Sequence, residues 1–257
     1  MTGKRNGMSI LVTVSLVYVA CCAYLYVAQR SFIYFPTPPA TNVAARDLRL
    51  EVDGATVQVW AHNEDDRDAI IYFGGNAEDV SLNIGQFSRI FPDKAIYLVN
   101  YRGYGASTGR PSETALIADA LAVYDHVTPM HDGISVIGRS LGSGVAAQLA
   151  ASRKVARLVL ITPYDSMVSV AHSAYPVFPV SLLLKDRYES SSHAGNITVP
   201  TLLLIAGRDE FIPMKSSRRL AAALQPGLTT VSVIEDAGHN TIQEYKGFST
   251  ALAEFMR

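Results

Sequence analysis

The chain has 257 residues, of which 49% are hydrophobic and 18% are charged, and its formal net charge at pH 7 is −1. A chain of this length can hold one α/β domain, and a near-neutral charge gives no indication of a nucleic-acid partner. The only two cysteines, Cys21 and Cys22, lie in an apolar segment near the N-terminus. The remaining sequence therefore offers no disulfide framework, no Cys-x-x-Cys pair and no thiol nucleophile.

The segment from Met8 to Ala28 is almost continuously apolar and contains no charged residue. About 20 apolar residues cross a bilayer as a helix, so residues 8–28 are predicted to form a transmembrane anchor. A cleaved signal peptide is an alternative, but its apolar core is usually only about 7–15 residues long. Lipidation of Cys21 after cleavage is a second alternative, although Tyr18 stands where such signals carry a small aliphatic residue.

The charges that flank this segment predict its orientation. Lys4 and Arg5 precede it, and Arg30 is the only charge close behind it. Positively charged flanks tend to stay in the cytoplasm, so we expect a cytoplasmic N-terminus and a catalytic domain on the outer, periplasmic or lumenal side. Residues 1–30 would then form the anchor and residues 31–257 one domain, whereas cleavage would leave a secreted or lipid-anchored protein.

Buried strands alternate with helices behind the proline-rich linker that ends at Pro39. Strands are predicted at 48–52, 57–61, 69–73, 95–100, 134–137, 158–161, 201–206 and 231–234. Helices are predicted at 81–90, from 112, at 145–151, at 215–224 and from about 241. The first two strands flank Asp53-Gly54, which is a hairpin signal. Strands that then alternate with helices predict an α/β fold with a mostly parallel sheet covered by helices on both faces.

Residues 138–142, GRSLG, have the form G-x-S-x-G and lie between a predicted strand and an alanine-rich helix. A strand that turns directly into a helix needs small residues around the turn, and the turn exposes the central serine at the carboxyl end of the sheet. The helix N-terminus adds free N–H groups and a positive dipole end, which favour a developing oxyanion. We therefore predict that Ser140 is a nucleophile.

Two later loops supply the other residue types that a serine nucleophile needs. A serine hydroxyl requires a general base, and the base is oriented by an acid. Asp209 follows the strand at 201–206, and His239 follows the strand at 231–234. Because the carboxyl ends of parallel strands meet at one edge of a sheet, we expect these side chains to lie near Ser140.

Other residues could fill the same roles less well. Glu210 and Asp236 are neighbouring carboxylates that could replace Asp209 as the acid. The remaining histidines follow no such pattern, and we expect surface or structural roles for His62, His126, His131, His172 and His193.

Acyl transfer also requires two backbone N–H donors that converge on the oxyanion. The amide of Leu141, directly after the nucleophile, is one predicted donor. The loop after the strand at 69–73 contains Gly75-Asn76, and the Asn76 amide is the predicted second donor. The alternative is that this loop is an ordinary Gly-Gly turn.

Six segments together resemble the α/β-hydrolase superfamily, and in particular its branch of membrane-anchored serine hydrolases with short lids, which includes protein depalmitoylases. The resemblance covers residues 31–256 through YFPT, GGNAED, NYRGYGASTGRPSE, GRSLGSG, ITVPTLLLIAGRDEFIP and AGHNTI. It implies an α/β-hydrolase fold and an acyl-enzyme that hydrolyses an ester, thioester or amide without a metal or organic cofactor. It also implies a nucleophile, an acid, a base and two oxyanion amides at Ser140, Asp209, His239, Asn76 and Leu141.

Two positions depart from the pattern of that branch. Gly74 stands where the branch usually carries histidine before Gly-Asn, so we expect a looser oxyanion loop. Asn100 stands where an acid commonly precedes Tyr-Arg-Gly, so we expect Arg102 to be held differently.

Residues 163–195 are apolar, aromatic and irregular, and they occupy the position of the superfamily's lid. An apolar lid beside a bilayer predicts a small-molecule or protein substrate that carries an acyl group, although the same side chains could simply pack on the core. A peptidase or amidase of the same fold and a non-catalytic scaffold stay open as alternatives. The presence of the triad residues and of both glycines in GRSLG favours an enzyme. The sequence makes no prediction of the oligomeric state.

Overall fold

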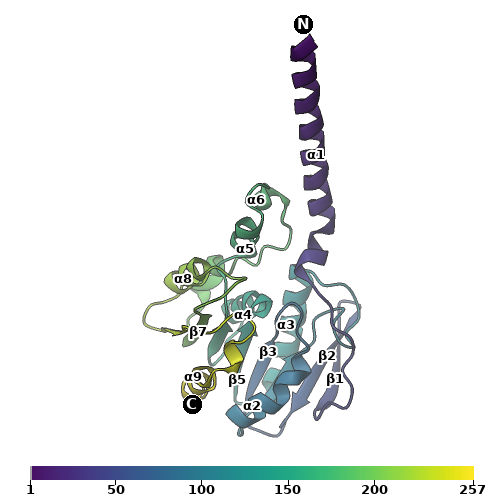
Figure 1. Cartoon of the computed structure of the whole chain (residues 1–257). Helices are drawn as coiled ribbons and strands as arrows, with labels where there is room; N and C mark the ends of the chain where they lie inside the picture. The colour runs from purple at the N-terminus through teal and green to yellow at the C-terminus, as the bar shows by residue number, and fades with distance from the viewer. Residues whose placement is uncertain (1) are drawn as a thin grey trace.

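The computed structural model describes residues 2–257, with side chains from residue 8 onward. A central sheet lies between helices, and a long N-terminal helix projects away from it (Figure 1). The strands are β1 (Arg46–Val52), β2 (Ala55–His62), β3 (Asp68–Phe73), β4 (Ala95–Val99), β5 (Gly133–Arg139), β6 (Leu158–Ile161), β7 (Thr201–Ala206) and β8 (Thr229–Ile234).

The order across the sheet is β1-β2-β4-β3-β5-β6-β7-β8. Strand β2 is antiparallel to both neighbours, and every later pair from β4–β3 to β7–β8 is parallel. The β1–β2 hairpin turns at Asp53 and Gly54, whose φ angles are 46° and 73°. Positive φ at both central residues is what a two-residue hairpin with a type I′ turn requires. The predicted hairpin and mostly parallel sheet are thus confirmed.

Helices cover both faces of the sheet. They are α2 (Ile84–Ile90), α3 (Glu113–Val127), α4 (Leu141–Ser152), α8 (Met214–Ala223) and α9 (Lys246–Phe255). Successive side chains of a strand point to opposite faces. Accordingly, Ile71 of β3 packs in one apolar cluster with residues of α3, α4 and α8, whereas Ile70 packs in a second cluster with residues of α2 and α9. The central strands are apolar on both sides for this reason.

The N-terminal helix α1 (Thr2–Ile33) is longer than the predicted anchor. Its stretch from Met8 to Ile33 is long and apolar enough to cross a membrane, judged by length and composition. The helix continues past Ala28 because its last turn has partners in the domain: Gln29 and Ile33 are both buried.

The segment between β6 and β7 stands above the carboxyl ends of the strands, beside the lower half of α1 (Figure 1). It contains α5 (Met167–Ala174), α6 (Val180–Leu183) and α7 (Ser190–His193). Its base is fixed to α8, because Asp165 Oδ2 accepts a hydrogen bond from Arg219 Nε at 2.7 Å and the Asp165 N–H donates to Ser216 Oγ at 3.2 Å. We call residues 163–195 the lid.

The predicted strands agree with the observed ones to within two residues at each end. The predicted helix boundaries are less accurate. The C-terminal helix was expected from about residue 241, but a 3₁₀ turn at Ile242–Glu244 precedes it and α9 begins at Lys246. Tyr245 interrupts the helix, with an extended backbone and a hydroxyl that donates to the carbonyl of Asp236 at 2.8 Å.

Candidate active site

Strand β5 turns into α4 at Ser140, which has φ 50° and ψ −116°. This backbone conformation is rare for a residue with a side chain and is found mainly where a site requires it. The backbone packs so closely around the turn that two positions have no space for a Cβ atom. A Cβ atom at Gly138 would lie 2.2 Å from the carbonyl oxygen of Gly142, and one at Gly142 would lie 2.0 Å from that of Phe73. The turn therefore requires glycine at both positions.

The structure brings Ser140, His239 and Asp209 together. His239 Nε2 lies 2.9 Å from Ser140 Oγ, and His239 Nδ1 lies 2.8 Å from Asp209 Oδ2. The three residues follow β5, β8 and β7, so they meet at the carboxyl edge of the sheet. The side chains of His239 and Asp209 are only 8% and 4% exposed. A carboxylate at Nδ1 favours the tautomer that leaves Nε2 free to accept the serine proton.

The neighbouring carboxylates do not reach the imidazole nitrogens. Glu210 accepts a hydrogen bond from the backbone N–H of His239 at 3.1 Å, and Asp236 pairs with Arg208 at the surface. Asp209 Oδ1 accepts two further bonds, from the backbone N–H groups of Phe211 (2.9 Å) and Ile212 (2.7 Å). These bonds fix the carboxylate in its orientation towards the histidine.

The remaining histidines lie elsewhere, and His131 illustrates a structural role. Its Nε2 atom is 2.8 Å from the hydroxyl of Tyr97, and its Nδ1 atom is 2.7 Å from the carbonyl of Asp66. Both ring nitrogens are therefore engaged between the sheet and a loop.

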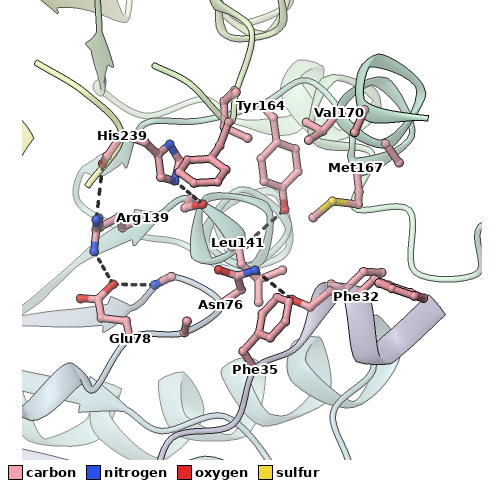
Figure 2. A pocket seen from close by; sticks show the side chains of 18 of the residues that line it. Phe32, Phe35, Asn76, Glu78, Arg139, Leu141, Tyr164, Met167, Val170 and His239 are labelled. Atoms are coloured by element: carbon pink, nitrogen blue, oxygen red, sulfur yellow. Dashed lines mark hydrogen bonds and ion pairs between the residues drawn. The ribbon is translucent and has the colours of Figure 1, made fainter. Parts of the chain in front are cut away.

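The backbone amides predicted for the oxyanion hole flank Ser140. Within residues 2–257, the N–H groups of Asn76 and Leu141 donate to no protein acceptor. Both peptide units at Asn76 are nevertheless held. The Gly75 carbonyl, which shares a peptide unit with the Asn76 N–H, accepts from Glu78 N at 3.4 Å, and the Asn76 carbonyl accepts from Phe35 N (3.0 Å) and from the Tyr104 hydroxyl (2.6 Å). Figure 2 shows Asn76 beside Leu141 at the base of the pocket. Two fixed amides with spare donors suit a developing oxyanion.

An ion pair that the sequence analysis did not single out links the surrounding loops. Arg139 Nη1 donates to Glu78 Oε2 at 2.9 Å, and Arg139 Nη2 donates to Asn240 Oδ1 at 3.1 Å and to the carbonyl of His239 at 3.4 Å. Burial alone would lower the pKa of the Arg139 guanidinium, but the Glu78 carboxylate outweighs it and raises that pKa. Arg139 therefore stays charged and connects the end of β5 to the histidine loop (Figure 2).

Glu78 connects the same ion pair to the oxyanion loop. Its Oε2 atom accepts from Gly75 N at 2.6 Å, and its Oε1 atom accepts from the Tyr72 hydroxyl and from Asn83 Nδ2, both at 2.6 Å. Burial raises the pKa of Tyr72 well above its usual range, so its hydroxyl remains a donor. Both charged residues lie inside recognised motifs, but nothing in their spacing indicates that they pair.

The two departures from the family pattern have different outcomes. The loop at Gly74 is not loose, because its carbonyl accepts from the Tyr101 hydroxyl at 2.7 Å and from Gly142 N at 3.1 Å. Arg102 forms an ion pair with Asp119, a residue that the sequence did not indicate, and the two shortest bonds measure 2.7 Å from Nε and 2.6 Å from Nη2. Asn100 bonds a neighbouring glutamine instead.

A cavity of about 860 Å³ opens above Ser140. Its polar end is formed by Ser140, His239 and the oxyanion loop, and its apolar walls come from the lid and from α1 (Figure 2). The apolar wall residues include Leu25, Phe32, Ile33, Phe35, Met167, Val170, Phe178, Leu183 and Leu184. Among the described residues, no group of three or more His, Cys, Asp or Glu side chains is placed to hold a metal ion.

Comparison with known proteins identifies the superfamily. No protein-family model matches the chain. It is 34% identical over 256 residues to an uncharacterized protein of Mycobacterium tuberculosis, across 93% of this chain and 91% of the relative. It is 28% identical over 255 residues to alpha/beta hydrolase domain-containing protein WAV2 of Arabidopsis thaliana, across 84% and 82%. It is 30% identical over 197 residues to alpha/beta hydrolase domain-containing protein 17B of Xenopus laevis, across 73% and 65%.

Solved structures show the same fold at lower identity. The esterase Pf2001 of Pyrococcus furiosus matches with a TM-score of 0.65 and 16% identity, across 86% of this chain and 98% of the esterase. The eight-stranded sheet with an antiparallel β2 and the named relatives together show that the chain belongs to the α/β-hydrolase superfamily. The resemblance drawn from its motifs and the predicted fold class are both confirmed.

Proposed function

We propose that this protein is a serine hydrolase that cleaves carboxylic ester or thioester bonds through an acyl-enzyme. The observation that carries the proposal is the hydrogen-bonded chain from Ser140 through His239 to Asp209, at distances of 2.9 and 2.8 Å. It stands at the polar end of a cavity whose other walls are apolar, which suits a substrate with an acyl group.

The geometry supports a two-step reaction. Ser140 Oγ attacks the substrate carbonyl carbon while its proton moves to His239 Nε2, and the amides of Asn76 and Leu141 hold the resulting oxyanion. The tetrahedral intermediate collapses as His239 gives that proton to the leaving alcohol or thiol. A water molecule then attacks the carbonyl carbon of the acyl-enzyme while His239 Nε2 accepts its proton. His239 returns that proton to Ser140 Oγ as the bond between Ser140 and the acyl group breaks, which releases the carboxylic acid and free Ser140. Asp209 stabilises the imidazolium in both steps.

We further propose that residues 8–28 remain as a single membrane anchor, with residues 31–257 as the catalytic domain and residues 163–195 as its lid. The charges at Lys4 and Arg5 favour a cytoplasmic N-terminus and a domain on the outer or lumenal side. Contacts support retention of the segment, because Leu25 and Gln29 of α1 both line the cavity above Ser140. Cleavage within residues 20–28 would remove part of that wall.

Hydrolysis of p-nitrophenyl esters with stepwise longer acyl chains tests this function. The detergent-solubilised wild type should release p-nitrophenolate, and Ser140→Ala should reduce kcat by at least about 10⁴-fold without changing thermal stability by more than about 1 kcal/mol. Folded wild-type protein that hydrolyses none of these esters would contradict the proposal and favour a non-catalytic scaffold.

A further inference from the structure

One face of α1 is covered by the rest of the protein. Cys22, Leu25, Gln29 and Ile33 are partly or fully buried, and their spacing of three or four residues places them along one side of the helix. Val27, on another side, is 79% exposed. Since Leu25, Gln29 and Ile33 also line the cavity above Ser140, α1 forms a wall of the candidate active site.

Polar contacts fix the lid to the lower end of α1. Gln29 Nε2 donates to the carbonyl of Leu183 at 3.0 Å, and Gln29 Oε1 accepts from the backbone N–H of Lys185 at 2.6 Å. Arg30 Nε donates to Asp186 Oδ2 at 2.9 Å. These bonds satisfy buried polar groups at the point where the apolar part of α1 meets the domain.

A second contact joins the tip of the lid, residues 177–182, to the part of α1 that lies farther from the domain. The Tyr18 hydroxyl donates to the carbonyl of Val177 at 2.9 Å, and the rings of Tyr18 and Phe178 stack with centroids 5.7 Å apart. Tyr18 precedes Arg30 by twelve residues, which corresponds to about 18 Å along a helix. The hydrocarbon core of a bilayer is about 30 Å thick. A membrane interface at Arg30 would place Tyr18 and the lid tip near the middle of the bilayer.

The surface of the lid tip fits that position. Val177 and Leu182 are 70% and 81% exposed, so the described residues leave both side chains largely uncovered. Apolar side chains exposed together on one protrusion are typical of a surface that contacts a membrane or another protein. Here the lipid surface is favoured, because the same protrusion is bonded to the apolar stretch of α1.

We propose that α1 and the lid form a groove open to the bilayer, through which the long acyl chain of a membrane-resident ester or thioester enters sideways and reaches Ser140. Phe32 and Phe35 line one side of the groove, and Met167 and Val170 line the other (Figure 2). Moving a methylene group from hydrocarbon into water costs free energy. A chain that slides from the leaflet into this groove avoids that step. This inference rests on the proposed hydrolase function and names its substrate class.

Two matched tryptophan variants of α1 test the groove. The full-length protein is placed in phosphatidylcholine vesicles and given either a long-chain acyl thioester held in the bilayer or the water-soluble p-nitrophenyl butyrate. Leu25→Trp fills the groove, so the ratio of kcat/KM for the long substrate to that for butyrate should fall about tenfold. Val27→Trp makes a comparable change on the exposed side of α1 and should leave the ratio at the wild-type value.

Fluorescence quenching tests the depth of the lid independently of catalysis. The chain has one tryptophan, Trp60, which is buried in β2 and provides a constant background. In Leu182→Trp, lipids brominated near the middle of their acyl chains should quench the added fluorescence. In Val231→Trp, on β8 of the sheet, the same lipids should not quench it.

The outcomes separate the two proposals. An equal ratio in Leu25→Trp and Val27→Trp, or an unquenched Leu182→Trp, would overturn the groove while butyrate hydrolysis continued to support the hydrolase. Absence of hydrolysis of both substrates by the wild type would contradict the hydrolase itself, and the groove's role as an acyl-chain entrance would fall with it.

Discussion

Arg139 Nη1 lies 2.9 Å from Glu78 Oε2, and both side chains are almost completely buried, at 10% and 11% exposure. Arg139 immediately precedes Ser140, whereas Glu78 holds the N–H of Gly75 beside Asn76. The ion pair thus sets the position of the loop at Gly75-Asn76 relative to Ser140. Its role is positioning, because neither charged group belongs to the hydrogen-bonded chain of Ser140, His239 and Asp209.

Breaking this ion pair should reduce both stability and turnover. Glu78→Gln leaves the Arg139 guanidinium buried without its counter-charge, which typically costs about 3–5 kcal/mol. We expect kcat on a short ester to fall about 10- to 100-fold as the Asn76 amide moves, with little change in KM. Urea unfolding and steady-state kinetics measure both effects.

The double variant Glu78→Gln/Arg139→Met provides the control for this prediction. Because it removes both charges, the double variant should lose about 0.5–3 kcal/mol less stability than the sum of the losses in Glu78→Gln and Arg139→Met. Strictly additive losses would show that the two residues act independently.

The backbone at Ser140 stores strain that a glycine would relieve. Its φ of 50° and ψ of −116° are open to glycine but costly for alanine. Ser140→Gly should therefore be more stable than Ser140→Ala, by about 1 kcal/mol after the greater unfolded-state entropy of glycine is subtracted. Thermal unfolding of the two inactive variants measures the difference. Equal melting temperatures would show that this turn is not strained.

The close approach at Gly142 should be intolerant of a single methyl group. A Cβ atom there would lie 2.0 Å from the carbonyl oxygen of Phe73, so Gly142→Ala must push β3 and α4 apart. We expect a loss of at least about 1–3 kcal/mol of stability together with loss of ester hydrolysis. Gly195→Ala is the control, since no atom lies within 4 Å of a Cβ at that position. A Gly142→Ala protein with wild-type stability and activity would contradict the packing described here.

The base of the lid should weaken at low pH. Burial raises the pKa of Asp165, but hydrogen bonds from Arg219, Ser216 and Ser169 outweigh it and hold that pKa below the ordinary value of 3.8. An acid whose folded pKa is depressed stabilises the fold above the unfolded pKa and loses that contribution as the pH falls through the folded pKa. The stability advantage of wild type over Asp165→Asn should therefore be constant above about pH 5 and shrink below about pH 4. A difference that is independent of pH would contradict the ion pair.

The strands and the three hydrogen-bonded residues Ser140, His239 and Asp209 could be predicted from the sequence because each leaves a local signal. Apolar runs mark β5, β6 and β7, Asp53-Gly54 marks the hairpin, and GRSLG fixes a turn that only a strand followed by a helix can make. The parallel sheet then places the loops after β5, β7 and β8 at the same edge. Such features depend on residues that are neighbours along the chain.

Features that depend on contacts between residues far apart in the sequence could not be predicted. Arg139 and Glu78 are separated by 61 positions, and Tyr18 contacts a lid residue 159 positions away. The extension of α1 to Ile33 has the same origin, since polar Gln29 ends the apolar run but finds its partners in the lid. The apolar sequence of α1 therefore gives no indication that the helix contacts the lid and lines the cavity.

The most direct test of the central claim is labelling with a fluorophosphonate probe, followed by mass spectrometry to locate the modified residue. Solubilised wild-type protein should be labelled on Ser140 alone, with label lost in Ser140→Ala and strongly slowed in His239→Ala and Asp209→Asn. A folded wild type that is not labelled, or one labelled equally well in His239→Ala, would contradict a nucleophile activated by this triad.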